Sequence, residues 1–401
     1  MAKHFAELFD YVHVFTTANS KSYQEERMLL PDNVKVEFLP TMDYRTVMSW
    51  FRKGKQVHLG EDVKKSWWVQ VLVRLRQTFP FSLLLGEGSL VYLASLLWNT
   101  RELLRGSSQT VLYTSYPPYA DLFGAYVLKK LHPGITWVVD FRDLHIEPIY
   151  RNVYFPHWQA AWNRRMLGSA AMLTTVSKGL SKKLEKYNRP IYVLENGLRS
   201  PIRKEGKLYD RFTIAYTGSM FGDERDPTPL LLVLTDLIER GRLCREKIRI
   251  VYAGKDSQVF GDQIKQAGLE SILEDRGLVS REEALMIQQR SHINLLLTTS
   301  STDHKGVVTG KLYEYLAALR PIIMLIKGPH DPELQELFES VQAGHVHSSE
   351  HGDVLQLESA VEAAYQDYLR GEATYLNRSI IEQRFSWERS ISELLQVLET
   401  I

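Results

Sequence analysis

The chain is organised around the stretch Gly310-Lys311-Leu312-Tyr313-Glu314-Tyr315-Leu316-Ala317-Ala318-Leu319-Arg320-Pro321. Its leucines recur at helical spacing and form one apolar stripe, while Lys311 and Glu314, three residues apart, share a different face. The pattern predicts a helix over residues 310–321 with one side in a core and one polar side.

Lys311 stands in the first turn of this predicted helix. A lysine there faces the positive end of the helix dipole, which is unfavourable unless an anion lies nearby. Free backbone N–H groups at the same end of a helix bind phosphate readily. An exposed Lys–Glu pair on a solvated helix would give the same pattern, so this stretch alone leaves both interpretations open.

Composition excludes several classes of protein. A chain of 401 residues is long for one domain and predicts two or three. Its 49 Lys and Arg against 48 Asp and Glu leave a formal charge of +1, so no global field recruits nucleic acid. Cys244 is the only cysteine, which excludes an intramolecular disulfide and a cysteine-based metal cage. We therefore expect a cytoplasmic protein, since no signal-peptide core and no membrane-spanning run is present.

Two series of alternating strands and helices predict two parallel sheets, each covered by helices on both faces. The chain begins with strands at 11–17 and 34–39 and a mostly helical region up to 105. The first series then has strands at 110–115, 135–141, 171–176 and 191–194, with helices at 119–131, 158–167 and 177–187. A polar stretch with proline and glycine then marks a domain boundary. The second series has strands at 212–217, 247–253, 272–274, 292–297 and 321–325, with helices at 229–240, 258–267, 281–290, 310–321, 332–340 and 354–369, before a separate last helix at 387–398.

The second series contains a candidate phosphate site. The strand at 212–217 opens into Gly218 and Ser219, and turns of this kind let backbone amides approach a diphosphate at the carboxyl end of a strand. Arg225 and Lys255 follow at the start of the next helix and the end of the next strand. Either cation alone is better explained as a solvated loop residue, but their combination with Lys311 favours a phosphate.

In the first series, several polar residues stand at the end of the strand predicted at 135–141. Asp140, Arg142, Asp143 and His145 follow an apolar strand, at the carboxyl edge where chemistry is usually placed, and Tyr116 ends the preceding strand. These residues predict a second part of the functional site, at the carboxyl edge of the first sheet. The alternatives are a structural salt bridge between Asp140 and Arg142 and a fixed turn after Tyr116.

Metal and hydrolase chemistry are less favoured. His345, His347 and His351 lie in a segment that we interpret as a loop, supported only by Glu350 and Asp353, so we predict no metal site there. No Gly-x-Ser-x-Gly elbow and no Walker-type loop occurs, which argues against a hydrolase or a kinase.

Seven motifs now stand in order along the chain: Ser115-Tyr116-Pro117-Pro118, Asp140-Phe141-Arg142-Asp143, Thr175-Val176-Ser177, Glu195-Asn196-Gly197, Tyr216-Thr217-Gly218-Ser219, Lys311-Leu312-Tyr313-Glu314-Tyr315-Leu316-Ala317 and Phe385-Ser386-Trp387. On these motifs the chain resembles the family four glycosyltransferases, and more closely the bacterial polysaccharide-type members (group 1 glycosyl transferases). The resemblance implies the GT-B fold, an α/β architecture of two Rossmann-like doubly wound domains facing across a cleft. The implied divisions are an N-terminal acceptor-side domain over 1–198, a linker over 199–210, a nucleotide-sugar domain over 211–380, and a segment over 381–401 whose helix packs back toward the first domain.

The resemblance also implies a role for each candidate residue. Glu314 would accept hydrogen bonds from the ribose hydroxyls, and cations would neutralise the leaving diphosphate. The implied donor-binding residues are Gly218, Ser219, Gly277, Val279, Val308, Thr309, Gly310, Lys311 and Glu314; the implied catalytic residues are Asp140, Asp143, Arg225 and Lys255; and the acceptor-side residues are Tyr116, Arg142 and His145. The expected reaction transfers a sugar from a nucleotide-diphosphate donor to a glycan or lipid-linked glycan, with retention and without a metal or other cofactor, in cell-surface polysaccharide biosynthesis.

Two differences from the family keep other functions open. The family often has an acid eight residues before Glu314, where this chain has Gly306, and it generally opens with a strand and a glycine-rich loop, whereas the strand at 11–17 matches the second strand of that pattern. The alternatives are a catalytically impaired partner protein that binds a nucleotide-sugar, and a GT-B nucleotide-sugar epimerase.

A membrane surface is a further candidate partner. Residues 61–79 predict a basic amphipathic helix with a tryptophan pair, and residues 154–166 again combine aromatic and basic side chains. Such segments suit the anionic inner face of a membrane, where lipid-linked acceptors are found. Packed helices with solvated cations explain the same pattern equally well.

Overall fold

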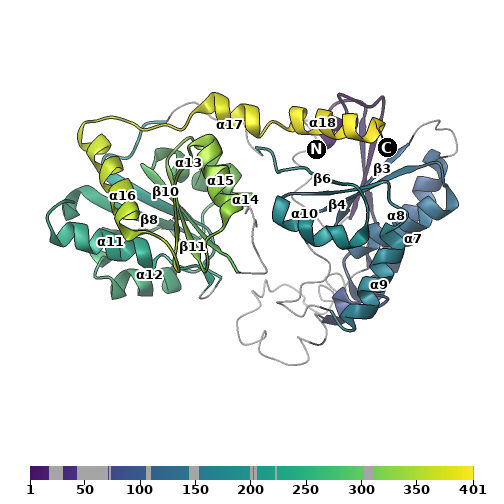
Figure 1. Cartoon of the computed structure of the whole chain (residues 1–401), viewed down its shortest axis with the longest axis horizontal. Coiled ribbons are helices and arrows are strands. Elements are labelled where there is room, and N and C mark those ends of the chain that lie inside the picture. The colour runs from purple at the N-terminus through teal and green to yellow at the C-terminus, as the bar shows by residue number, and fades with distance from the viewer. Residues whose placement is uncertain are drawn as a thin grey trace. The chain divides into compact units, whose positions relative to one another are not determined.

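The computed structural model describes residues 1–17, 30–42, 71, 74–104, 110–143, 153–198, 202, 206–221, 224–301 and 310–400. The chain divides into two compact units, one formed by Met1–Glu195 with Glu388–Ile401 and the other by Asn196–Trp387 (Figure 1). Gly197 and Trp387 lie against each other where the chain enters and leaves the second unit. A Cβ on Gly197 would come within 2.5 Å of the Trp387 ring, so the glycine allows this close approach.

The second unit contains a six-stranded sheet whose described pairings are all parallel. Its strand order is β12-β11-β10-β7-β8-β9, so the direction in which successive strands are added reverses between β7 and β10. The strands are β7 (Phe212–Thr217), β8 (Ile248–Ala253), β9 (Leu273–Asp275), β10 (Ile293–Thr299), β11 (Ile322–Lys327) and β12 (Gly344–Ser348). This is the Rossmann order, and the reversal is the switch point at which doubly wound sheets bind ligands.

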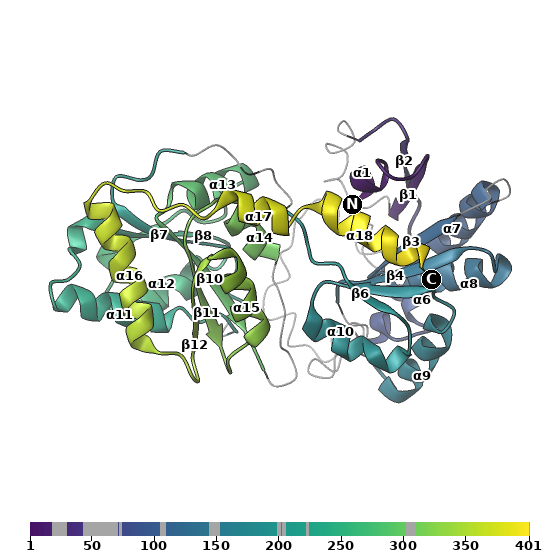
Figure 2. The same cartoon turned by 45° about the horizontal axis from the view of Figure 1, so that its top comes forward.

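Helices cover both faces of this sheet, as Figures 1 and 2 show. They are α11 (Thr228–Glu239), α12 (Ser257–Gln266), α13 (Arg281–Arg290), α14 (Gly310–Ala317), α15 (Pro332–Val341), α16 (Val354–Leu369) and α17 (Arg378–Arg384), with short 3₁₀ turns η4 (Arg245–Lys247) and η5 (Glu270–Ile272). Successive strand residues serve opposite faces: in β11, Ile323 and Leu325 join the core under α11 and α16, whereas Ile322 and Met324 join the core under α14 and α15. The strands are therefore apolar almost throughout, as is typical of a parallel sheet covered on both faces, the arrangement that the alternation of strands and helices predicted.

The predicted helix at 310–321 forms, but it is shorter than expected. The helix α14 ends at Ala317, and the backbone of Leu319 is left-handed with φ 56°. Pro321 disfavours helical geometry at the residue before it, so the chain turns before β11. Leu319 is nevertheless buried in the same core as the leucines of α14, so the apolar stripe continues without the helix.

Two further elements of the second unit were missed by the sequence analysis. Residues 344–348 were interpreted as part of a loop, but they form the edge strand β12, which pairs with β11. Gly344 begins it at φ 134°, where a Cβ would lie 2.2 Å from the Ile322 carbonyl oxygen. The second element is α17, whose N-terminus is capped by the Asn377 side chain.

The first unit contains a four-stranded parallel sheet in the order β3-β4-β5-β6 and a two-stranded parallel sheet, β1-β2. The strands are β1 (Val12–Thr17), β2 (Val34–Leu39), β3 (Val111–Tyr116), β4 (Thr136–Phe141), β5 (Met172–Thr175) and β6 (Ile191–Val193). The helices are α1 (Ala2–Phe5), α6 (Ser82–Leu85), α7 (Ser89–Leu104), α8 (Tyr119–Leu131), α9 (Pro156–Leu167), α10 (Lys178–Leu184) and α18 (Trp387–Glu399), with the turn η2 (Glu185–Tyr187). The last helix, α18, contacts β6 through a hydrogen bond from Tyr192 Oη to Glu393 Oε2 at 3.0 Å.

Most of the predicted tryptophan helix at 61–79 lies outside the described residues. Within the part of the chain that the structure describes, no helix is both long enough and apolar enough to cross a bilayer.

Candidate functional site

The turn after β7 is fixed by two buried tyrosines. Tyr216 Oη donates to the Ser219 carbonyl at 2.7 Å and Tyr252 Oη donates to the Gly218 carbonyl at 3.0 Å. Gly218 itself lies at φ 140°, a conformation that favours glycine. Both carbonyls therefore have a donor, and among the described residues the Ser219 N–H has no acceptor. The turn thus leaves one backbone donor at the carboxyl end of β7 for a ligand.

Lys311 occupies the space above this turn. A Cβ on Gly218 would lie only 1.4 Å from Lys311 Nζ, so the lysine uses the room that glycine leaves. The Nζ atom is buried 5.2 Å from the Tyr216 ring centre, and no described residue accepts a hydrogen bond from it. Burial, and then the positive charge of Arg225, lower the pKa of Lys311 to about 8. A buried ammonium without an acceptor is costly, and an anionic ligand would supply the missing partner.

Arg225 reaches the split between β7 and β10. These two strands are paired only at Ile293–Ile214 and Asn294–Ala215, so later backbone groups need other partners. Arg225 Nη1 donates to the Leu297 carbonyl of β10 at 2.7 Å, and Tyr315 Oη accepts from the Thr217 N–H of β7 at 3.1 Å. The two strands therefore separate toward their carboxyl ends, and the guanidinium of Arg225 lies at this separation.

Lys255 and Arg225 both lie beside Phe221. The Arg225 Cζ atom is 4.9 Å from the Phe221 ring centre and Lys255 Nζ is 5.7 Å from it. The three cations predicted from the sequence, Arg225, Lys255 and Lys311, are thus gathered around one turn. Sequence analysis missed Phe221, although a large apolar residue in a glycine turn, where no core is available, is a signal that could have been noticed.

Glu314 lies on the polar side of α14, as predicted, and is half-buried. Its Oε1 atom is 3.9 Å from Nη2 of Arg281, the first residue of α13. The loop before α13 contains Gly277, whose carbonyl accepts from the Gly254 N–H at 2.8 Å, and Val279, which packs on the sheet. The loop is therefore held against the strand end that precedes Lys255, and Arg281 is a neighbour of Glu314 that the sequence analysis did not single out.

Three of the predicted residues lie outside the part of the chain that the structure describes. Val308 and Thr309 precede α14, and His145 follows β4. Gly310, the first residue of α14, is exposed, and a Cβ there would meet no atom within 4 Å.

In the first unit, Asp140 is part of a buried network. Its Oδ2 atom accepts from Arg142 Nε at 2.6 Å and from Ser115 Oγ at 3.4 Å, and its Oδ1 atom accepts from Thr174 Oγ1 at 2.7 Å. The Asp140 side chain is fully buried, so this geometry favours the structural salt bridge that the sequence left as an alternative. The network holds the ends of β3, β4 and β5 together.

The other first-unit candidates surround this network. Asp143 is exposed, which leaves its carboxylate open to a partner. Tyr116 is buried and packs on Phe141, with ring centres 5.7 Å apart. The structure describes two of the predicted acceptor-side residues. Arg142 lies beside Asp140, and Tyr116 is largely a core residue.

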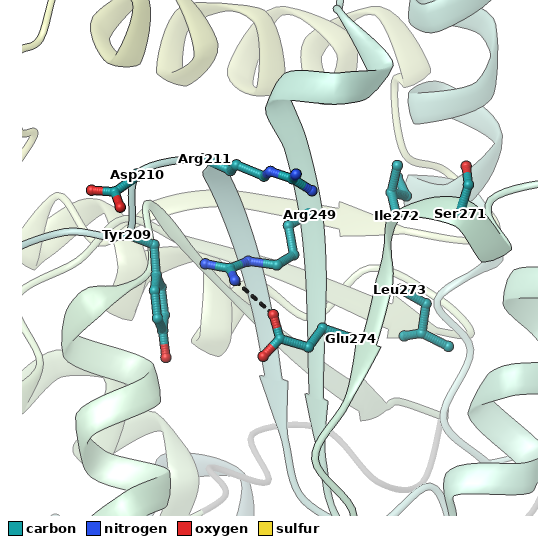
Figure 3. Close-up of a pocket in the computed structure, with 8 residues that line it drawn as sticks. All are labelled: Tyr209, Asp210, Arg211, Arg249, Ser271, Ile272, Leu273 and Glu274. Atoms are coloured by element: carbon teal, nitrogen blue, oxygen red, sulfur yellow. Dashed lines mark hydrogen bonds and ion pairs between the residues drawn. The ribbon is translucent and has the colours of Figure 1, made fainter.

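A cavity of about 540 Å³ lies at the other end of the second sheet, near the start of β7, β8 and β9 (Figure 3). Its residues are Tyr209, Asp210, Arg211, Arg249, Ser271, Ile272, Leu273 and Glu274. Arg249 Nη1 donates to Glu274 Oε2 at 2.6 Å, and Arg276 also pairs with Glu274. The cavity lies at the amino ends of the strands and is thus separate from the predicted phosphate site.

The histidines of β12 do not form a metal cage. The His345 and His347 rings are 6.5 Å apart, and burial lowers the pKa of both. Among the described residues, no group of three or more His, Cys, Asp or Glu side chains is placed to hold a metal ion.

Comparison with known proteins gives a fold but no close relative. No protein-family model matches the chain, and no curated protein matches it. Among solved structures, the sucrose-phosphate synthase of Thermosynechococcus elongatus aligns with a TM-score of 0.57 at 11% identity, over 100% of this chain and 91% of the synthase. A trehalose-phosphate synthase (UDP-forming) of Burkholderia xenovorans, in complex with glucose-6-phosphate, aligns with a TM-score of 0.54 at 11% identity, over 99% and 95%. The lipopolysaccharide outer core galactosyltransferase WaaB aligns with a TM-score of 0.53 at 12% identity, over 98% and 99%.

These alignments extend over nearly all of the chain and of each neighbour. They show that the chain has the fold of the two-domain GT-B glycosyltransferases, which confirms the α/β fold class predicted from the sequence motifs. At 11–12% identity the likeness concerns the fold, and the function has to be argued from the site.

Proposed function

We propose that this protein is a glycosyltransferase that binds a nucleotide-diphosphate sugar in the Asn196–Trp387 unit and transfers the sugar to a glycan or lipid-linked glycan acceptor. One observation carries the proposal: Lys311 Nζ is buried above Gly218 without an acceptor among the described residues, at the switch point of a Rossmann-ordered sheet. A diphosphate oxygen would provide that acceptor.

The neighbouring cations support departure of a diphosphate. When the bond between the sugar and the diphosphate breaks, negative charge grows on the leaving oxygen, and fixed cations in a partly dry site stabilise it. Arg225 is anchored on the Leu297 carbonyl, and among the described residues no carboxylate forms an ion pair with it, so its charge is available to the ligand. This charge stabilisation requires no metal ion, which agrees with the metal-independent reaction implied by the family resemblance. Retention of the anomeric configuration is proposed from that resemblance alone.

Glu314 and the loop before α13 suit the nucleoside. A carboxylate accepts two hydrogen bonds from a ribose diol, and Glu314 is half-buried on α14, the helix that also carries Lys311. Leu278 is exposed at 77% beside Gly277 and Val279. In this proposal its side chain covers one face of the base. The proposed donor-binding residues are Gly218, Ser219, Gly277, Val279, Val308, Thr309, Gly310, Lys311 and Glu314.

The first unit supplies the acceptor side in this proposal. Asp143, Arg142 and His145 would contact the acceptor, while Asp140 acts through its buried bond to Arg142. Neighbours named as galactosyltransferase and trehalose-phosphate synthase act on sugars, which supports sugar transfer as the reaction class. We propose cell-surface polysaccharide biosynthesis in the cytoplasm as the setting.

A membrane-bound acceptor is supported by exposed apolar side chains on two segments of the first unit, which together we call the apolar surface. Phe81, Leu84, Phe155 and Trp158 are exposed by 42–72%, and the segment of Phe79 packs on α9 through Trp158, with ring centres 5.8 Å apart. The exposed Arg164 and Arg165 lie on the same helix. We propose that this surface rests on the anionic inner face of a membrane. Flotation with vesicles should recover more protein when anionic lipid is present, and equal recovery would remove the electrostatic part of this proposal.

The test of the central proposal is turnover of labelled donors. Purified protein incubated with a panel of radiolabelled UDP-, GDP- and other nucleotide-sugars should slowly hydrolyse one of them, and Lys311→Met should abolish that hydrolysis. Binding without hydrolysis or transfer would favour the alternative, a catalytically impaired nucleotide-sugar-binding partner. Interconversion of two free nucleotide-sugars or sugars would favour the epimerase.

A further inference from the structure

Phe221 is an exposed aromatic residue with an unusual backbone. Its side chain is 55% exposed, and its φ of 52° places it in the left-handed region, which is unfavourable for a bulky residue. None of the apolar clusters of the described residues includes it. The ring therefore gains little from burial, while its backbone costs free energy, and strained residues of this kind concentrate at functional sites.

The ring contacts two like charges. Arg225 Cζ lies 4.9 Å and Lys255 Nζ lies 5.7 Å from its centre, both within the range of cation–π attraction. Two cations held near each other repel, and the negative face of an aromatic ring reduces the cost of bringing them together. An aliphatic side chain of similar size would provide contact area but not this attraction.

The two cations depend on the ring to different degrees. Arg225 has a second anchor, because its Nη1 atom donates to the Leu297 carbonyl at 2.7 Å. Lys255 is exposed, and within the described parts of the chain the Phe221 ring is the only side-chain partner shown for its Nζ atom. A loss of the ring should therefore release Lys255 more than Arg225.

We propose that Phe221 is a positioning residue that holds Lys255 and Arg225 beside the Gly218 turn, so that both cations meet the diphosphate of the donor. This inference rests on the proposed function and adds a residue to it. Phe221 acts through the cations and need not touch the sugar or the phosphates itself. The strained and exposed aromatic side chain is then explained by the charges beside it.

The test compares side chains of similar bulk with and without an aromatic face. The affinity for the nucleoside diphosphate that binds best, chosen from UDP and GDP, would be measured by calorimetry for wild type and for Phe221→Leu, Phe221→Ala and Phe221→Tyr. Phe221→Leu and Phe221→Ala should each weaken binding about tenfold, and Phe221→Tyr should restore it to within about twofold of wild type. Wild-type affinity in Phe221→Leu would overturn the proposal, because it would show that the aromatic face is not needed.

A double-mutant cycle separates positioning from a general structural role. In a Lys255→Ala background, Phe221→Leu should weaken binding only about twofold to threefold, because the side chain that depends most on the ring is already absent. An equal loss in both backgrounds would overturn the proposal and point to loss of local structure. If wild type binds neither UDP nor GDP nor any nucleotide-sugar, the proposed function fails together with this inference. If wild type binds and the cycle shows no coupling, only the role of Phe221 fails.

Discussion

A Cβ placed on Gly218 would lie 1.4 Å from Lys311 Nζ, so the two residues, 93 positions apart in sequence (311 − 218), occupy one shared space. The turn after β7 and the first turn of α14 are thereby fitted to each other. Neither residue explains the site alone, since the glycine provides the room and the lysine provides the charge.

We expect Gly218→Ala to disturb nucleotide binding through this contact. The added methyl group cannot coexist with Lys311 Nζ in its present place, so the lysine must move and the affinity for UDP or GDP should fall by at least about tenfold. Gly241→Ala is the matched control, because Gly241 also has a positive φ, of 66°, but a Cβ there meets no atom within 4 Å. Both variants should lose some stability, and only Gly218→Ala should lose binding in calorimetry. Equal affinities in the two variants would contradict the shared-space argument.

Lys311→Met should separate stability from binding. Lys311 Nζ is buried without an acceptor among the described residues, and an apolar side chain of similar length removes that cost. We expect the free energy of unfolding at pH 7, measured by urea denaturation, to rise by about 1 kcal/mol. The affinity for a nucleoside diphosphate should fall about 10- to 100-fold because a charge-assisted hydrogen bond is lost. Reduced stability together with unchanged affinity would mean that Lys311 is a structural residue.

The lowered pKa of Lys311 predicts how binding depends on pH. Burial and the charge of Arg225 lower this pKa to about 8, so the side chain is charged below that pH and neutral above it. A phosphate prefers the charged form, and the affinity for UDP or GDP should therefore fall as the pH rises from 7 to 9. The same shift predicts that stability without ligand rises as the pH increases above about 8, because the folded state loses its proton before the unfolded state does. In Lys311→Met both trends should be absent over this range, and a persisting fall in affinity would assign the titration to another group.

Much of the fold follows from periodicity, whereas the ends of elements depend on tertiary contacts. The helices over 119–131, 281–290 and 354–369 and the strand over 212–217 form with the predicted bounds, because their flanking residues stop them. The strand β12 was missed because its two histidines and its exposed first residue give no apolar run. The helix α14 begins at Gly310 as predicted, but its C-terminal end was missed, since Leu319 leaves the helix and yet keeps its place in the core.

The candidate site was predictable in part. Gly218 was predicted from its place in the turn after a strand, and Arg225, Lys255 and Lys311 from their charge at strand and helix ends. The structure brings all four around one turn. Their order in the sequence could not reveal that Phe221 lies beside two of the cations, because this contact depends on the left-handed backbone of one residue. Nor could it reveal Arg281 beside Glu314, which requires α13 and α14 to meet over the sheet.

We expect Glu314→Gln to distinguish ribose recognition from phosphate binding. If Glu314 accepts hydrogen bonds from the ribose, the variant should bind UDP or GDP more weakly by about 1.5–3 kcal/mol and should bind inorganic diphosphate with unchanged affinity. Arg281→Ala is the companion variant, because Arg281 Nη2 lies 3.9 Å from the Glu314 carboxylate. It should have a smaller effect in the same direction. An equal loss for nucleotide and inorganic diphosphate in Glu314→Gln would exclude the ribose assignment.

Asp140→Asn should act mainly on stability. Asp140 is fully buried and accepts from Arg142, Ser115 and Thr174, so its substitution removes the negative charge that the half-buried guanidinium of Arg142 faces and changes three buried hydrogen bonds. We expect the free energy of unfolding to fall by about 2–4 kcal/mol in urea denaturation. Asp143→Asn is the control, because the Asp143 side chain is exposed, and it should change the free energy of unfolding by less than about 0.5 kcal/mol. If Asp140→Asn instead keeps full stability and loses sugar transfer, Asp140 is a catalytic residue after all, and the salt bridge to Arg142 serves the reaction and not the fold.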